Sequence, residues 1–299
     1  MANINIDNYK KAIRLEEPFA PTMSDIDDKT VLAERVLLML RNEKAGTQDI
    51  DIPEDYTAQR KLIRALLNIR QPLPLDKEMM QLLDKLLHIE KEEKEKTSPE
   101  SIRNIQSDFP KTRFKEADKM ALWQGDITNI EADAIVNAAN EKLLGCMQPL
   151  HGCIDNVIHS AAGPMLRDDG AEIIHRQKTD EEAGNAKITR GYHLPAKYVI
   201  HTVGPALSDG EEVSARHETT LVSSYRSCLD IAQEKGDVKT LVFPAISTGE
   251  FNFPEERAAE IAVWTVDEWL KTHEHHFTKV IFNVFTEADR AIYEAVLNA

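Results

Sequence analysis

The chain has 299 residues and a formal net charge of −15, from 36 Lys and Arg against 51 Asp and Glu. This surplus of negative charge repels phosphate backbones at long range, so we expect no nonspecific nucleic-acid binding. The 42% of hydrophobic residues is typical of a soluble globular protein, and the length suggests about two domains. No apolar run approaches the roughly 18 residues of a membrane span, and the first residues do not resemble a signal peptide. We therefore expect a cytoplasmic protein without a membrane partner.

The first third of the chain has the apolar spacing of helices. Between about residues 30 and 90, apolar residues recur every three to four positions in three successive stretches. A charge run at 90–96 follows, which we interpret as a solvated helix end, and Ser98 with Pro99 then favours a short helix. The sequence predicts a small all-helical module over residues 1–110, without a chemical motif. Three roles stay open for it: covering the ligand site, guiding a protein substrate, or stabilising the following domain.

Beyond about residue 113, short β-rich runs alternate with helical stretches. This alternation indicates a mixed, largely parallel sheet with helices on both faces, so we predict a three-layer α/β/α domain over residues 111–299. The expected strands are 120–123, 134–136, 198–203, 240–243 and 279–285, and the expected helices are 154–162, 164–175, 214–235, 254–272 and 287–297. In such sheets a ligand lies beyond the carboxyl ends of the strands, where the motif-bearing segments of this chain fall.

Four segments at strand ends carry the residues that are informative about function. They are Gln124-Gly125-Asp126-Ile127-Thr128, Val136-Asn137-Ala138-Ala139-Asn140, the stretch from Leu144 to His159, and the stretch from Pro244 to Phe251. Each alone is a common kind of turn. In this order and at this spacing, the four resemble the macrodomain family, and the resemblance covers about residues 113–299. It implies ADP-ribose as the ligand.

The resemblance implies an adenine site and a ribose site. Asp126 and Ile127 are expected at the adenine, where Phe285 can stack on the ring. Asn137 and Asn140 are expected near the distal ribose, which Asn140 orients through its amide. The alternatives are an Asx-type turn at Asp126, a turn-forming role for both asparagines, and core packing of Phe285.

The segment Ser247-Thr248-Gly249-Glu250 is expected to bind the pyrophosphate. It follows an expected strand and precedes an expected helix, and successive backbone amides there can bind phosphate without basic side chains. Gly249 permits a positive φ or a close approach of the backbone. These local amides explain how an acidic protein can bind an anionic nucleotide. By the same resemblance, Phe251 lies against the distal ribose.

The loop after Asn140 departs from the glycine-rich phosphate loop of most macrodomains. Cys146, His151 and Cys153 lie within eight residues, and this set is a zinc site with one coordination position open. Three protein ligands are typical of catalytic zinc, which polarises bound oxygen. The pattern resembles the zinc-containing macrodomains of bacteria and fungi. The alternative is a chance grouping with buried thiols.

Other polar residues are interpreted as structural or supporting. Cys228 has the helical spacing of a core residue, and the stretch His273-Glu274-His275-His276 is expected as a solvated loop. Asp155 matches the position of an acidic residue near the scissile ribose of related hydrolases, although a helix N-cap is equally open. His159, one turn later, is expected to pack or to support the site.

The resemblance implies a zinc-dependent ADP-ribosyl hydrolase that removes mono-ADP-ribose from acidic side chains of a protein. The implied partners are ADP-ribose and a mono-ADP-ribosylated protein, in an oligomeric state that the sequence leaves open. Asn140 and Asp155 are the expected catalytic residues, and Zn²⁺ is the expected cofactor, near the anomeric carbon. Two alternatives stay open: a module that binds ADP-ribose without cleaving it, and a deacylase of free O-acyl-ADP-ribose.

Overall fold

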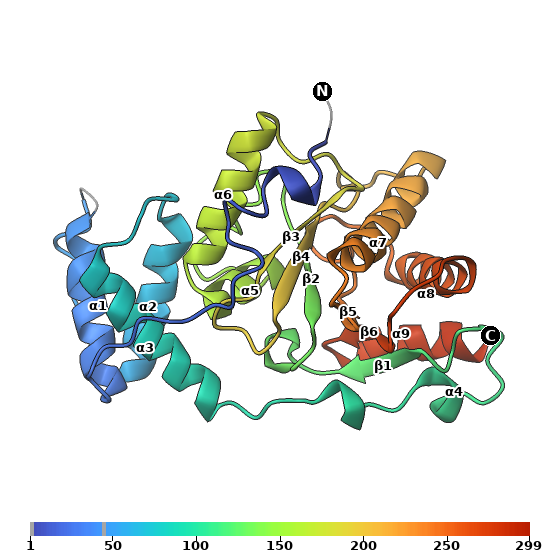
Figure 1. Cartoon of the computed structure of the whole chain (residues 1–299), viewed down its shortest axis with the longest axis horizontal. Helices are drawn as coiled ribbons and strands as arrows, with labels where there is room; N and C mark the ends of the chain where they lie inside the picture. The colour runs from blue at the N-terminus through green and yellow to red at the C-terminus, as the bar shows by residue number, and fades with distance from the viewer. Residues whose placement is uncertain (1–2, 44–45) are drawn as a thin grey trace.

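The computed structural model describes residues 3–43 and 46–299, which form one six-stranded sheet with flanking helices (Figure 1). The strands are β1 (Met120–Gln124), β2 (Ala134–Ala138), β3 (Ala186–Arg190), β4 (Tyr198–Thr202), β5 (Thr240–Phe243) and β6 (Lys279–Val284). Their order across the sheet is β1-β6-β5-β2-β4-β3. Neighbouring strands are parallel except for β3, which pairs antiparallel with β4. The mixed, largely parallel sheet that the sequence predicts is confirmed.

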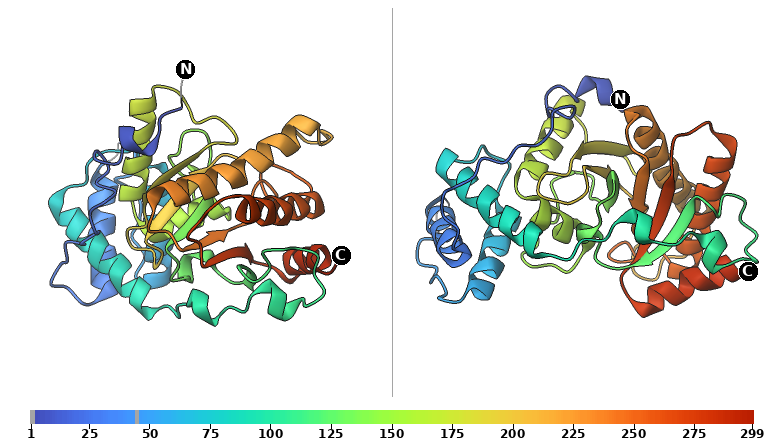
Figure 2. Two further views of the ribbon diagram at one scale, coloured as in Figure 1. Left: turned by 45° about the vertical axis from the view of Figure 1, so that its right-hand side comes forward. Right: turned by 60° about the horizontal axis from the view of Figure 1, so that its bottom comes forward.

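Helices pack on both faces of this sheet, as the two views of Figure 2 show. The helices of the sheet domain are α5 (Ile154–Ala162), α6 (Met165–Gln177), α7 (Ala215–Lys235), α8 (Glu255–Thr272) and α9 (Glu287–Asn298). Successive side chains of a strand point to opposite faces, so Val136 packs in the cluster of α7, α8 and α9, whereas Ile135 packs in the cluster of α5. The three-layer α/β/α architecture follows from this alternation.

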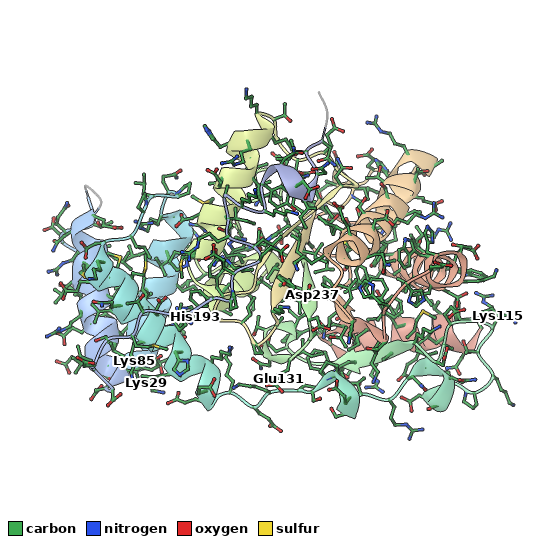
Figure 3. The ribbon with its side chains drawn as sticks, in the orientation of Figure 1. Lys29, Lys85, Lys115, Glu131, His193 and Asp237 are labelled. Carbon is green, nitrogen blue, oxygen red and sulfur yellow. The ribbon has the colours of Figure 1, made fainter. Side chains whose placement is uncertain are left out.

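Three helices before the sheet have an apolar cluster of their own. They are α1 (Lys29–Glu43), α2 (Tyr56–Ile69) and α3 (Lys77–Glu93), which we call the three-helix unit. The unit lies against α5 through α2. It also contacts the sheet domain through α3, where Asp84 lies 2.9 Å from His193, and both side chains are buried. Figure 3 labels His193 between the three-helix unit and the sheet.

Segments that precede the sheet in sequence cover both of its edges. The backbone amide of Ile188, on edge strand β3, donates a hydrogen bond of 3.0 Å to the hydroxyl of Tyr9. Tyr9 is buried in the same apolar cluster as α7, α8 and α9. At the other edge, Asn104 forms an antiparallel bridge with Ala121 of β1. These contacts satisfy backbone groups that an open sheet edge would leave unpaired.

Short helices complete the chain and agree with the expected caps. They are the 3-10 helices η1 (Ile6–Asn8), η2 (Pro99–Ser101) and η3 (Ile127–Asn129), and the α-helix α4 (Ile105–Asp108). Ser98 caps η2 and Pro99 opens it, as predicted from the sequence. No helix within residues 3–43 and 46–299 is long and apolar enough to cross a membrane.

Candidate functional site

The motif-bearing segments meet at one edge of the sheet. Strands β1, β6, β5 and β2 are adjacent and parallel, so their carboxyl ends lie side by side. Asp126 follows β1 and Phe285 follows β6, whereas Ser247 follows β5 and Asn140 follows β2. The strand order therefore places the expected adenine residues at one side, the expected ribose residues at the other, and the expected phosphate segment between them.

At the expected adenine side, the structure has one exposed aromatic ring and one carboxylate oxygen without a hydrogen bond to the described residues. Asp126 caps η3: its Oδ1 accepts hydrogen bonds from the Thr128 amide (2.9 Å) and hydroxyl (2.7 Å), so the Asx-type turn is present. Its Oδ2 has no hydrogen bond to the residues that the structure describes. Ile127 is buried, at 4% exposure. Phe285 is 73% exposed, so the alternative that it packs in the core is wrong.

The phosphate segment has backbone amides without partners. Within the described parts of the chain, the amides of Thr248, Gly249 and Glu250 donate no hydrogen bond. The positive φ allowed for at Gly249 occurs instead at Ser247, with φ of 68°, a conformation that is unfavourable for a residue with a side chain. A Cβ built on Gly249 has no atom within 4 Å, so the space beside it is open. Phe251 is half-buried against the core.

Asp155 lies at the centre of a buried amide network. Its Oδ1 accepts a hydrogen bond from Asn137 Nδ2 (2.8 Å), and its Oδ2 accepts one from Asn140 Nδ2 (3.3 Å). Burial raises the pKa of Asp155 to about 6, against the opposing effect of these two amides. The N-cap of α5 is Cys153, so the N-cap alternative for Asp155 is wrong, and the carboxylate lies within the first turn. Asn137 is fully buried and supports Asp155 in this arrangement.

Two histidines lie beneath this network. Burial lowers the pKa of His159 well below its usual value and that of His201 to about 3, so both rings are neutral. His159 Nε2 lies 3.5 Å from Asp155 Oδ1, which agrees with a packing or supporting role. His201 Nδ1 accepts a hydrogen bond of 3.1 Å from Asn137. The sequence analysis missed His201, although a histidine within an apolar strand is a signal of a buried polar network.

The candidate metal ligands come together in the segment 145–153, which we call the metal loop. One donor atom from each of Cys146, His151 and Cys153 lies within 4.8 Å of the others, and Cys146 Sγ is 3.5 Å from His151 Nδ1. Tetrahedral zinc, with bonds of about 2.0–2.3 Å, separates its ligand atoms by about 3.5–3.8 Å, so small side-chain movements would complete the set. No other such group of His, Cys, Asp or Glu occurs in the part of the chain described by the structure.

The burial and the hydrogen-bond partners of the three candidate ligands are compatible with metal binding. Both Cys146 and Cys153 are half-buried, and burial raises the pKa of the Cys153 thiol to about 12. Metal binding requires the thiolate and would offset this cost. His151 Nε2 lies 3.2 Å from a carboxylate oxygen of Glu250, which leaves Nδ1 as the nitrogen that faces Cys146. By contrast, Cys228 is fully buried in the core, as predicted.

Gly145, at the start of the metal loop, permits a close approach to the buried network. Its φ is +73°, and a Cβ at this position would lie 2.7 Å from the ring of His159. Its carbonyl oxygen accepts a hydrogen bond of 3.1 Å from Asn140. A side chain here would displace either the loop or the histidine, so glycine is required for this geometry.

The fold and the site define a class of protein, an α/β/α domain with a polar site at the carboxyl ends of parallel strands. A sequence profile of the Macro domain matches residues 136–262. A protein-ADP-ribose hydrolase from Treponema medium is 42% identical over 259 residues, which are 87% of this chain and 95% of that protein. A protein-ADP-ribose hydrolase from Staphylococcus aureus (strain MRSA252) is 41% identical, over 87% of this chain and 92% of that protein.

Solved structures agree with these sequence relatives. A Trypanosoma brucei macrodomain in complex with ADP-ribose has a TM-score of 0.58 and 29% identity, over 75% of this chain and 91% of that chain. A mutant Oceanobacillus iheyensis macrodomain with ADPR has a TM-score of 0.54 and 33% identity, over 60% of this chain and 91% of that chain. The chain belongs to the macrodomain family.

Proposed function

We propose that this protein is a zinc-dependent hydrolase that removes mono-ADP-ribose from acidic side chains of a modified protein, and that it belongs to the zinc-containing subgroup of macrodomains. One observation carries the proposal: the donor atoms of Cys146, His151 and Cys153 lie within 4.8 Å of one another in the metal loop. The first carbonyl oxygen of this loop, that of Gly145, accepts a hydrogen bond from Asn140. The sequence relatives named protein-ADP-ribose hydrolase support hydrolysis over binding alone.

In this proposal, ADP-ribose lies along the carboxyl edge of the sheet. The adenine lies near Asp126 and Phe285, the free amides of residues 248–250 bind the pyrophosphate, and Asn140 orients the distal ribose. Residues 111–299 carry binding and catalysis, and residues 1–110 support them, through the three-helix unit and through segments that pack on the sheet domain. The strand order supports this arrangement because it places the proposed phosphate residues between the proposed adenine residues and the proposed ribose residues.

The residues of the chain supply orientation and a proton acceptor. Asp155, with a pKa of about 6, is mostly ionised at pH 7 and can accept a proton from an attacking water. The amides of Asn137 and Asn140 hold its two oxygens in place. Water then replaces the carboxylate of the acceptor at the anomeric carbon, which releases ADP-ribose and the free acid. Zinc, when bound by the three ligands, supplies a Lewis acid that polarises an oxygen of the substrate.

Release of ADP-ribose from a protein that is mono-ADP-ribosylated on carboxylates tests the proposal. Wild type should release it, and His151→Ala should lose at least about 100-fold in rate, at matched folding by circular dichroism. The exposed His175 offers a control, because His175→Ala removes an imidazole in the last turn of α6, outside the metal loop, and should keep the rate. Saturable ADP-ribose binding without release by wild type would overturn hydrolysis and favour a binding module.

A further inference from the structure

The metal loop is held by a helix that precedes it by more than eighty residues. The amide of Leu150 donates a hydrogen bond of 3.0 Å to Asn68 Oδ1, and Arg64 Nη2 donates one of 2.9 Å to the carbonyl oxygen of His151. Arg64 and Asn68 both lie on α2, in the three-helix unit. Two consecutive residues of the loop, one of them a candidate ligand, are therefore fixed from outside the sheet domain.

Asn156 of α5 joins these two side chains into one buried cluster. Its Oδ1 accepts hydrogen bonds from Arg64 Nε (2.8 Å) and Asn68 Nδ2 (3.3 Å). Its Nδ2 donates to Asn68 Oδ1 (3.1 Å) and to the carbonyl oxygen of Gln148 (3.0 Å). Asn156 is fully buried and Asn68 is 3% exposed, so the hydrogen bonds between these two amides are shielded from water.

The metal loop has little internal support. Between residues 146 and 153, one backbone hydrogen bond closes within the loop, from the His151 amide to the Gln148 carbonyl, at 3.3 Å. Leu150 has a φ of 59°, a left-handed conformation that is unfavourable for leucine. Its amide is the group that Asn68 binds, so the hydrogen bond stabilises the unfavourable conformation. The shape of the loop thus depends on the cluster behind it.

We propose that Arg64 and Asn68 are positioning residues that fix the metal loop and so hold His151 beside Cys146 and Cys153. The inference rests on the proposed metal site and assigns α2 a part in building it. Binding costs less when ligands are held in their bound arrangement beforehand, so loss of either side chain lowers zinc affinity.

Zinc affinity, measured on the full chain by competition with a chromogenic chelator, tests this inference. We expect Asn68→Leu and Arg64→Met to weaken Zn²⁺ binding by about 10–100-fold, as for other residues that orient metal ligands. Substituted Co²⁺ reports the ligand geometry directly, because its thiolate charge-transfer band should shift or weaken in both variants. ADP-ribose affinity should change less than about twofold, and kcat should fall while KM stays, because Arg64 and Asn68 make no hydrogen bond to residues 248–250.

Matched controls lie on the same helix. Gln59 is a buried amide, 2% exposed, that bonds the Pro53 carbonyl at 2.9 Å and does not touch the metal loop. Arg60 lies one turn before Arg64 and bonds Glu90 and the Ser160 carbonyl. Gln59→Leu and Arg60→Met should keep zinc affinity within about twofold. Equal losses in the controls would overturn the positioning role, because the effect would then be a general loosening of α2.

A conservative variant separates positioning from folding. Asn68→Asp keeps the oxygen that accepts from Leu150 and Asn156, so its zinc affinity should lie much closer to wild type than that of Asn68→Leu. Unchanged zinc affinity in both Asn68→Leu and Arg64→Met, with the metal lost in Cys153→Ala, would overturn the positioning role alone. A wild type that binds no zinc would overturn the metal site itself and this inference with it.

Discussion

Glu250 connects the phosphate segment to the metal loop. The resemblance to macrodomains placed it among the ADP-ribose contacts, whereas the structure has its carboxylate 3.2 Å from His151 Nε2. A carboxylate that accepts from one ring nitrogen fixes the tautomer and makes the other nitrogen a better metal ligand. The side chain of Glu250 therefore links the position of the His151 imidazole to that of the segment proposed to bind the pyrophosphate.

We expect Glu250→Ala to weaken zinc binding by about tenfold, because His151 then loses the partner that orients its ring. Chelator competition measures the change, and Glu256→Ala, an exposed residue in the first turn of α8, serves as the control. Because the Glu250 side chain is 66% exposed, its removal should not lower the free energy of unfolding by more than about 0.5 kcal/mol. Wild-type zinc affinity in Glu250→Ala would contradict this role.

Among single residues, the sequence identifies candidate site residues when they lie close together along the chain. Cys146, His151 and Cys153 are recognisable as candidate ligands because they lie within eight residues of one another in one loop. Arg64 and Asn68 are not recognisable, because their role depends on the docking of α2 against α5. Asn68 lies beside the apolar residues of its helix, but its burial, which indicates a structural role, is known only from the structure.

Among the elements, α6 is placed by one glycine. A Cβ on Gly170 would lie 2.1 Å from the carbonyl oxygen of Leu143, in the segment that leads into the metal loop. Helix α6 therefore packs against the backbone of that segment more closely than any other residue type would permit. This contact fixes the segment before the metal loop against α6, a helix that follows the loop in the sequence, whereas α2 precedes it.

We expect Gly170→Ala to destabilise the protein by up to about 2 kcal/mol. Alanine favours a helix by about 1 kcal/mol over glycine, but the clash with a buried carbonyl costs about 1–3 kcal/mol because the backbone has no free space into which to move. Urea unfolding measures the difference. Gly249→Ala is the control, since a Cβ there meets nothing within 4 Å. A higher free energy of unfolding in Gly170→Ala would show that the helix propensity of alanine outweighs the clash with the Leu143 carbonyl.

Most elements can be predicted from periodicity and caps. Helix α5 spans the expected residues, and α7 and α9 begin at the capping residues Ser214 and Thr286. Strand β3 is missed because it carries Lys187 and Arg190, and such charged residues interrupt the apolar run that marks a buried strand. Lys187 is nonetheless fully buried, paired at 2.6 Å with Glu181. Such a pair is visible only in three dimensions.

At the scale of the whole molecule, the first residues of the chain belong to the core of the sheet domain. Tyr9 and Ile13 pack with α7, α8 and α9, and the Tyr9 hydroxyl accepts from edge strand β3. The three-helix unit, which follows in sequence, has a separate core. Periodicity predicts the helices of residues 1–110 but not this path, because short apolar segments carry no information about which distant surface they cover.

We expect Tyr9→Ala to lower the free energy of unfolding by about 3–5 kcal/mol, through loss of a buried aromatic ring. Tyr9→Phe should cost only about 1 kcal/mol, the contribution of the hydrogen bond from Ile188. Urea unfolding measures both. Zinc affinity should not change in Tyr9→Phe, because Tyr9 lies in the cluster on the face of the sheet away from α5. An equal loss in the free energy of unfolding for Tyr9→Ala and Tyr9→Phe would contradict this account of the contact with β3.

The place of β6 in the sheet bears on how the protein is made. It is the last strand in the sequence, yet it lies between β1 and β5, and β1 pairs with no other strand of the described residues. Until β6 is synthesised, β1 and β5 therefore each have a strand edge without its partner, and the two parts of the sheet join only when β6 is added between them.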